Sequence, residues 1–271
     1  TINPKLGLNY EFVDDHFLFT SLSRSYEVPT ASDVADVVKN GEHENAIDPQ
    51  AAWTYEIGMR GGDDDLFFDV TLYYSKIKDE ILTRCKSGGS CSETIAFNAD
   101  STVHSGIELG FGYKVLEDLF STGDKVRFNG TWNHNNFKFD NDEEFGDNRL
   151  PVIPTDTVFA SLKYEHHSGF YTELEYRYAS KRGATYDGSG GDGWEIPSYE
   201  TWGLLAGYKP ENKPYSFYLQ GTNLTDEIYV STYTAEPTQP TSGFPPSAQE
   251  FVDVRVANGR AVYAGFTYEF D

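Results

Sequence analysis

The chain has 271 residues and a formal net charge of −22 at pH 7, from 43 acidic and 21 basic residues. This acidity excludes a nucleic-acid-binding protein, which needs basic patches to contact phosphate groups. The 19 Tyr and 19 Phe residues favour β-strands over helices. No apolar run reaches the roughly 20 residues that a membrane-spanning helix needs.

Apolar and polar residues alternate along about eleven segments, which is the pattern of strands with one apolar face. In the last segment, Val262, Ala264 and Phe266 share one face, while Tyr263 and Gly265 share the other. We therefore predict an all-β protein. In chain order the predicted strands are 6–12, 16–24, 53–60, 66–76, 105–115, 126–133, 158–165, 171–178, 202–208, 215–221 and 262–270.

The connections between these strands alternate strictly between short and long. Short links are expected at 14–15, 61–65, 116–123, 167–168 and 211–214. Long links are expected at 25–51, 78–103, 138–154, 181–198 and 223–258. A barrel that crosses a membrane has tight turns at one end and long loops at the other. A soluble β-sandwich has no reason to sort its links in this way.

One face of the predicted strands carries charged side chains such as Glu56, Glu108 and Arg177. That face suits either the water around a soluble sandwich or the polar lumen of a barrel. Aromatic residues near the strand ends, such as Trp53 and Tyr113, are typical of the girdles at a membrane surface. With the sorted links, they predict a transmembrane antiparallel β-barrel with about 11 strands in this chain.

Two short segments carry residues that bind metals or form crosslinks in other proteins. Cys85 and Cys91 flank a glycine-containing stretch, which favours a local disulfide over free thiols or a metal site. Asp140, Asp142 and Glu144 lie in an acidic run whose spacing resembles a calcium loop but lacks the bidentate Glu at its end. A solvated acidic loop is the alternative for this run.

Motifs of enzyme chemistry are missing from the sequence. It contains no GxSxG, Walker or HExxH pattern. Glu173 and Glu175 share a face, as a glycosidase pair does, but they belong to a face full of charges. We expect a protein that is not an enzyme and needs no cofactor.

Four stretches resemble the TonB-dependent outer-membrane receptors, in the order that this family keeps. "GTNLTDEIYV" (221–230) is similar to the near-terminal motif N-L-x-D-x-x-Y. "SRSYEVP" (23–29) is similar to S-R-S-Y/F-x-x-P, and "WTYEIG" (53–58) to W-x-Y-E-x-G. "NRLPVIP" (148–154) is similar to N-x-L-P-x-x-P. Asp271, which follows the terminal aromatic Phe270, departs from the family pattern.

The resemblance implies a 22-stranded barrel with a plug domain inside it. Residues 1–271 would be the C-terminal part of that barrel domain, with the plug and the N-terminal strands lying outside this chain. The implied location is the bacterial outer membrane. The implied partners are outer-membrane lipid, the plug, the remaining barrel strands, a small iron chelate and the TonB–ExbB–ExbD complex, which acts through the plug.

The function implied by the family is energised uptake of a scarce chelate, a ferric siderophore or ferric citrate. Alternatives are haem, cobalamin, copper or glycan as cargo, a passive porin-like barrel, and a soluble acidic β-sandwich that binds a ligand. Aromatic side chains and a few arginines in the outer loops suit an anionic chelate. For each, loop packing or solvent exposure is the alternative. The candidates are Arg24, Tyr26, Arg84, Lys181, Arg182, Tyr186, Trp194, Tyr199, Tyr229, Tyr233 and Arg255.

Overall fold

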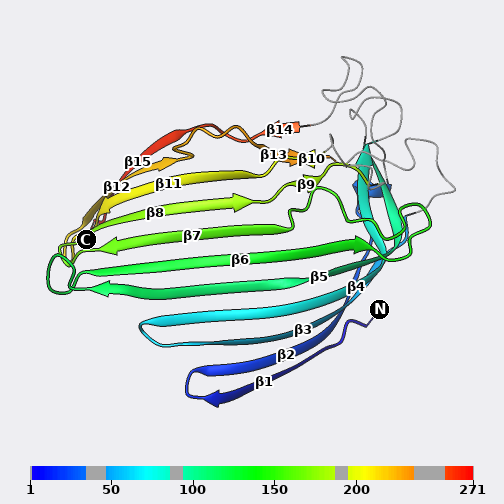
Figure 1. Cartoon of the computed structure of the whole chain (residues 1–271), viewed down its shortest axis with the longest axis horizontal. Helices are drawn as coiled ribbons and strands as arrows, with labels where there is room; N and C mark the ends of the chain where they lie inside the picture. Colours follow the sequence, from blue (N-terminus) through cyan, green and yellow to red (C-terminus); the bar gives the residue numbers. More distant parts are fainter. Residues whose placement is uncertain (1, 35–46, 86–93, 187–194, 235–253, 271) are drawn as a thin grey trace.

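Eleven antiparallel strands form one continuous sheet in the computed structural model of the chain (Figure 1). The structure describes residues 2–34, 47–85, 94–186, 195–234 and 254–270. This part of the chain contains no helix that is long and apolar enough to span a bilayer. The predicted all-β fold and the number of strands in the main sheet are therefore confirmed.

Each strand of the main sheet pairs with its neighbours in chain order. Two small two-stranded sheets stand in the long links, where no strand was predicted. They are β9 (Arg182–Gly183) with β10 (Glu195–Ile196), and β13 (Val230–Tyr233) with β14 (Val254–Val256). The main sheet consists of β1 (Lys5–Val13), β2 (His16–Glu27), β3 (Gln50–Gly62), β4 (Leu66–Cys85), β5 (Thr94–Glu117), β6 (Lys125–Phe139), β7 (Asp156–Glu165), β8 (Phe170–Ala179), β11 (Tyr199–Tyr208), β12 (Tyr215–Thr222) and β15 (Ala261–Tyr268).

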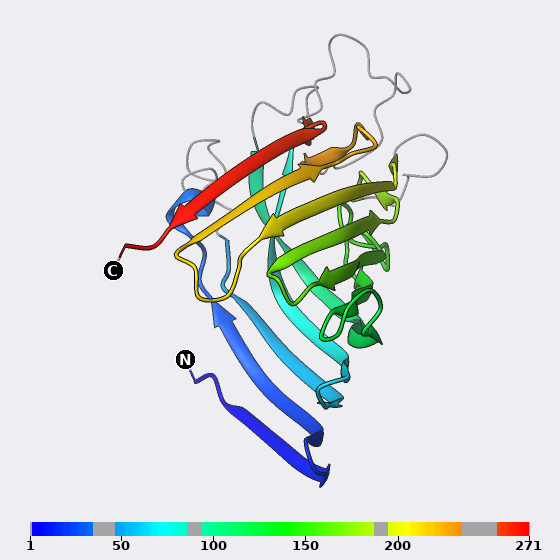
Figure 2. The ribbon, with the colours of Figure 1, turned by 90° about the vertical axis from the view of Figure 1, so that its left-hand side faces the viewer.

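The sheet curves into an open trough, as Figure 2 shows. The short links lie together at one end of the strands, and the long links lie at the other end (Figure 1). β15 pairs with β12, and β1 pairs with β2, so each has one edge without a partner strand among the described residues. The predicted sorting of links by length is confirmed, and the sheet does not close on itself.

The register sets all the predicted apolar positions on one surface of the sheet. Leu72 lies opposite Ile57 on one neighbouring strand and opposite Ile107 on the other. We call this surface the apolar face, and Leu72 is 47% exposed on it. The reverse surface, the polar face, carries Glu56 and Glu108 in the adjacent register positions. The alternation in the sequence therefore becomes two chemically distinct walls.

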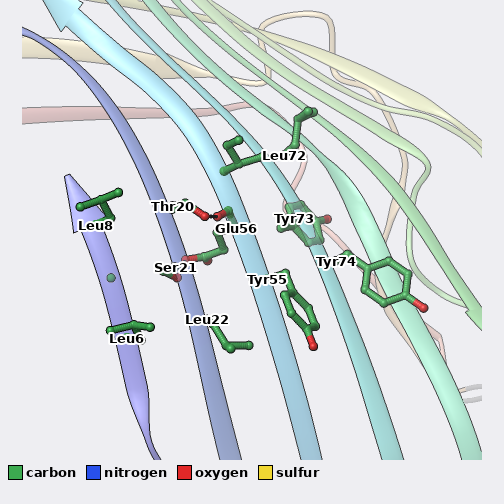
Figure 3. A pocket seen from close by; sticks show the side chains of 12 residues that line it. Leu6, Leu8, Thr20, Ser21, Leu22, Tyr55, Glu56, Leu72, Tyr73 and Tyr74 are labelled. Carbon is green, nitrogen blue, oxygen red and sulfur yellow. Dashed lines mark hydrogen bonds between the residues drawn. The ribbon is translucent and has the colours of Figure 1, made fainter. Parts of the chain in front are cut away.

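An apolar hollow of about 730 Å³ lies against β1–β4, and Figure 3 shows its lining. Leu6, Leu22, Tyr55 and Tyr74 form one continuous row across these four strands. The Thr20 hydroxyl, which is also in the lining, donates to the carbonyl of the neighbouring strand at 2.8 Å. The hollow thus offers hydrocarbon with few free polar groups, which suits an apolar chain better than a polar ligand.

On the polar face, four glycines each lie directly opposite an aromatic residue of the next strand. A Cβ atom on any of these glycines would come within 2.2–2.5 Å of that aromatic ring. The missing side chain therefore leaves the space that the ring occupies, and the aromatic residue covers the glycine. The pairs are Phe19 with Gly58, Tyr73 with Gly106, Tyr171 with Gly207, and Tyr218 with Gly265.

The prediction of a long link at 78–103 is wrong for most of its length, because β4 continues to Cys85 and β5 begins at Thr94. The alternation fails here because Asp79 adopts a left-handed backbone with φ of 56°. Beyond it, Glu80 accepts a hydrogen bond from Thr102, and its carboxylate lies 3.3 Å from Nε2 of His104. Both partners belong to the polar face, so β4 exchanges its faces at Asp79.

The short link between β5 and β6 is organised by one buried carboxylate, Asp124. It accepts hydrogen bonds from the backbone N–H groups of Leu119, Phe120 and Ser121 at 2.7–3.1 Å, and from the Tyr164 hydroxyl at 3.0 Å. Burial opposes the charge of Asp124, but these hydrogen bonds outweigh it, so its pKa lies below the ordinary value. The charged carboxylate therefore holds this turn in shape.

We expect Asp124→Asn to destabilise the protein at neutral pH, because the amide offers one acceptor oxygen instead of two. A carboxyl whose pKa is lowered on folding stabilises the protein above its unfolded pKa, about 3.9. That stabilisation disappears as the pH falls through the lowered pKa of the folded state. Urea unfolding at pH 7 and at lower pH should therefore show a difference between wild type and variant that shrinks on acidification.

Exposed Asp64, in the short link between β3 and β4, supplies the matched control. Asp64→Asn should have little effect on unfolding at pH 7. A difference between wild type and Asp124→Asn that stays constant down to strongly acidic pH would contradict the role of the charge.

Candidate functional site

A polar hollow of about 340 Å³ lies on the polar face, near the end of the sheet that carries the long links. Side chains from β8, β11, β12 and β15 converge on it, because alternate positions of adjacent strands share a face. We call it the polar hollow. Its lining includes Glu175, Arg177, Thr201, Gln220, Tyr229 and Tyr263.

Arg177 is the cation of the polar hollow. Its Nη2 atom lies 3.2 Å from a carboxylate oxygen of Glu175, and its guanidinium stands 4.8 Å from the ring centroid of Phe159. The Arg177 side chain is nevertheless 59% exposed. A guanidinium that is oriented by a carboxylate and a ring, and that remains accessible, can receive an anionic group from solution.

The polar hollow is bounded by the turn that follows β12, and Asn223 ties this turn to the start of the last strand. The Asn223 side-chain amide donates to the carbonyls of Glu227 at 2.9 Å and Asn258 at 3.3 Å, and its oxygen accepts from Glu227 N at 2.9 Å. Asp226 accepts from Arg260 N at 2.9 Å. The Asn and Asp of the sequence motif therefore join two segments that are more than thirty residues apart.

Both motif residues also adopt a left-handed backbone, with φ of 47° at Asn223 and 58° at Asp226. Asn and Asp accept this conformation more readily than other side chains that carry a Cβ atom. The motif thus combines a backbone requirement with hydrogen bonds. This explains its chemistry without assigning either residue to a ligand.

Tyr229, the last residue of the motif, stacks on Tyr199 with ring centroids 4.0 Å apart and an angle of 17° between the rings. Burial, and to a lesser degree the neighbouring Tyr199, raises the pKa of Tyr229 above its ordinary value. Its hydroxyl therefore stays protonated at neutral pH and can donate a hydrogen bond. These two sequence candidates are brought together beside the polar hollow.

Two other candidates, Arg84 and Tyr186, meet in a second place. Tyr186 is buried, and its hydroxyl donates to the carbonyl of Thr83 at 2.8 Å. Arg84 lies 2.7 Å from Glu144 and 4.6 Å from the ring centroid of Phe97. Both contact an aromatic cluster that we call the loop core. Its buried members are Ala99, Phe139, Phe145, Leu150 and Tyr186.

The loop core joins the projecting ends of β4 and β5 to the long link after β6. Phe145 and Tyr186 have ring centroids 5.5 Å apart, and Phe139 lies 4.8 Å from Phe145. Burial raises the pKa of Tyr186 well above its ordinary value. These contacts show that Arg84 and Tyr186 pack the outer loops together.

Four more candidates lie near the small sheets. Lys181 pairs with Glu195 at 2.9 Å, and Arg182 is buried and donates to the carbonyl of Val230 at 3.1 Å. Tyr233 packs in a buried cluster with Ala184 and Ile196, and Arg255 is exposed on β14.

Arg24 and Tyr26 stand apart from these groups, on β2. The register places Arg24 opposite Trp53, on the same side as Leu22, which is the apolar face. Trp194 and Cys91 lie outside the described residues, as does the side chain of Cys85, so the predicted disulfide stays a prediction.

The acidic run holds its carboxylates on separate partners. Asp140 pairs with Lys76 at 2.8 Å, and Glu144 pairs with Arg84. The side chain of Asp142 accepts from three backbone N–H groups at 2.8–3.0 Å and thereby caps the turn. Lys76 lowers the pKa of Asp140 chiefly through their hydrogen bond. Within the described ranges, no group of three or more His, Cys, Asp or Glu side chains is placed to hold a metal ion.

The sequence candidates did not include Arg177, Gln220 or Tyr263, which line the polar hollow. The signal for them was present. They occupy polar-face positions on strands that lead into, or out of, long links. Selecting candidates from the links alone left out the upper wall of the sheet.

Comparison with protein families gives one match. Residues 1–224 match the family model described as TonB dependent receptor-like, beta-barrel. The match covers most of the chain and includes ten of the eleven strands of the main sheet.

Solved structures show the same fold at low sequence identity. The ferric yersiniabactin uptake receptor FyuA from Yersinia pestis is 18% identical, with a TM-score of 0.68, over 98% of this chain and 37% of that chain. The ferric citrate transporter FecA in its unliganded form is 17% identical, with a TM-score of 0.72, over 99% and 38%. The copper transporter OprC is 18% identical, with a TM-score of 0.72, over 99% and 39%. The chain therefore spans less than half the length of these structures.

We expect Asn223→Ala to loosen the junction between the turn after β12 and the start of β15. The change removes three hydrogen bonds and places Ala in a left-handed conformation, which together cost about 1–3 kcal/mol. Hydrogen exchange of the whole receptor should show faster exchange in 223–229 and 258–260 than in the wild type. Asn223→Gly, which accepts the left-handed backbone, should lie between the two, and equal exchange in all three proteins would contradict this role.

Proposed function

Because the chain belongs to the TonB dependent receptor-like β-barrel family, we propose that it forms the C-terminal part of the barrel of an outer-membrane transporter. The apolar face contacts lipid, and the polar face lines the lumen around a plug. Further barrel strands pair with the free edges of β1 and β15. The TonB–ExbB–ExbD complex acts on the plug to drive uptake.

We propose a small anionic iron chelate, a ferric siderophore or ferric citrate, as the cargo. The observation that carries this proposal is the accessible guanidinium of Arg177 in the polar hollow, oriented by Glu175 and Phe159. Tyr229, held by its stack on Tyr199, supplies a neutral hydrogen-bond donor beside it. A cation and phenol donors on a fixed wall suit the anionic oxygens of such a chelate.

Copper is the second candidate cargo, since a copper transporter is as similar in fold as the ferric citrate transporter. The lining of the polar hollow favours the chelate. Copper ions prefer imidazole nitrogen and sulfur ligands, whereas Arg177, Gln220 and Tyr263 offer guanidinium, amide and phenol groups. Haem, cobalamin and glycan cargoes, and a passive porin-like barrel, have no specific observation in their favour. The proposal assigns no catalytic step to any residue.

We expect Arg177→Gln to weaken binding of a ferric siderophore or ferric citrate by the whole receptor about tenfold or more, because a charge-assisted hydrogen bond is lost. Tyr229→Phe should weaken it less, since it keeps the stacked ring and removes only the hydroxyl. Quenching of tryptophan fluorescence on addition of each iron-loaded chelate measures both affinities.

Two controls make this test specific. Lys213→Gln removes the same charge from an exposed position in a short link and should leave the affinity unchanged. The metal-free chelates should bind more weakly than the iron-loaded forms. Wild-type affinity in Arg177→Gln for every chelate tested would contradict the proposed site, and selective binding of copper would assign the cargo to the second candidate.

We also expect opposite effects from one substitution at two adjacent positions of β4. Leu72→Lys places a charge on the apolar face near the middle of the strand and should cost about 2–4 kcal/mol in a bilayer. Thr71→Lys places the same charge on the polar face and should cost less than about 1 kcal/mol. The folded fraction of the whole receptor in lipid vesicles, measured by heat-modifiable gel migration, compares them. Equal losses would contradict a lipid-facing apolar wall.

A further inference from the structure

A crevice of about 950 Å³ lies at the end of the apolar face that carries the long links. The link after β6, at 147–156, forms one side, and residues 178–185 form the other. Trp132, Val158 and Tyr178 make one continuous row across the apolar face, and Asp156 stands in the next row toward the long links. The crevice therefore begins where the apolar wall ends, and we call it the arginine crevice.

Arg182 gives the arginine crevice an uncompensated charge. The residue is only 8% exposed, and its Nη2 atom donates to the carbonyl of Val230 at 3.1 Å. No carboxylate of the described residues lies within 4.0 Å of its guanidinium. Burial lowers the pKa of Arg182 below its ordinary value, but an arginine remains a cation at neutral pH. A buried cation without a counter-charge is costly, so an anion that reaches it is held firmly.

A second buried group in the same lining lacks a partner. Thr185 is 3% exposed, and its hydroxyl oxygen makes no hydrogen bond with any described residue. Buried hydroxyl groups are normally satisfied. Two buried donors, a guanidinium and a hydroxyl only three residues apart in the chain, therefore line one crevice without sufficient acceptors.

The acidic groups of the crevice are already engaged. Asp156 accepts from the Trp132 indole at 3.0 Å and lies 2.9 Å from the ring nitrogen of His134. Glu195 pairs with Lys181, and Asp147 accepts a backbone N–H of the same link at 3.0 Å. These carboxylates leave the cation of Arg182 unopposed. Exposed Arg149, also in the lining, donates to the carbonyl of residue 135 at 2.9 Å and adds a second guanidinium.

We propose that the arginine crevice binds a phosphate group, and that a lipid headgroup in the leaflet next to the long links supplies it. A guanidinium binds phosphate through two parallel hydrogen bonds, and a threonine hydroxyl adds a third donor. The continuity of the crevice with the apolar face sets the acyl chains of the same lipid against Tyr178 and its row. The choice of lipid rests on the proposed orientation of the apolar face in the membrane.

The test uses the whole receptor in detergent, stripped of lipid, and three soluble probes. These are dihexanoyl phosphatidate, dihexanoyl phosphatidylcholine and inorganic phosphate. Isothermal titration should show the tightest binding for the phosphatidate, since it joins a phosphate monoester to acyl chains. Arg182→Gln should weaken phosphatidate binding about tenfold or more, and Lys213→Gln should leave it unchanged.

Thr185→Val separates binding from folding, should Arg182→Gln fold poorly. It removes a buried, unsatisfied hydroxyl without changing the shape of the side chain, so the melting temperature of the lipid-free receptor should rise or stay level. The same variant should bind phosphatidate several-fold more weakly. A gain in stability together with a loss of affinity identifies a hydroxyl that serves a ligand.

Equal phosphatidate affinity in wild type, Arg182→Gln and Thr185→Val would overturn the site. Inorganic phosphate that binds as tightly as phosphatidate would overturn the lipid as its source and leave a site for a soluble anion. Chelate binding measured on the same proteins keeps this result separate from that of the proposed function. Arg182→Gln should retain chelate binding, and Arg177→Gln should retain phosphatidate binding.

Discussion

The pleat of the β-strand is the constraint on which the rest of this structure depends. Successive side chains point to opposite faces, so a period of two in the sequence becomes two walls with different chemistry. Leu72 with Ile57 and Ile107 shows the result on one face, and Glu56 with Glu108 shows it on the other. A shift of one residue in any pairing would exchange the walls, so the long runs of uninterrupted register are as important as composition. The glycines beneath aromatic rings on the polar face help to keep that register in place.

Above the regular wall, the chain is held by contacts that are distant in sequence. The loop core packs Tyr186 against Phe145 and the end of β6, and Asn223 joins the turn after β12 to the start of β15. Each device fixes a long link at its base. The polar hollow therefore stands on a wall whose strands and adjoining turn are positioned before a ligand arrives. Such preorganisation lowers the entropy that a ligand must lose on binding.

The sequence could predict the wall because the wall obeys a local rule. The eleven strands and the sorted links follow from the alternation, and the prediction failed where Asp79 exchanges the faces of β4. The site was less accessible to this reasoning. Nothing local distinguishes Tyr186, which packs in the loop core, from Tyr229, which borders the polar hollow, because their neighbours come from other strands. Arg177 belonged to a predicted polar face, yet only the register shows that it meets residues of β11 and β12 near the long links.

The two arginines Arg177 and Arg182 show how the fold gives one side chain two different properties. They are five residues apart, on and just after β8, in a chain with a net charge of −22. Arg177 is exposed beside a carboxylate, so an incoming anion must compete with Glu175 but can also leave easily. Arg182 is buried beside a carbonyl, where an anion would neutralise a charge that the protein itself leaves unpaired. Exchange suits a transported ligand, and retention suits a resident lipid. The difference in burial therefore separates a site for cargo from a site for the surrounding membrane.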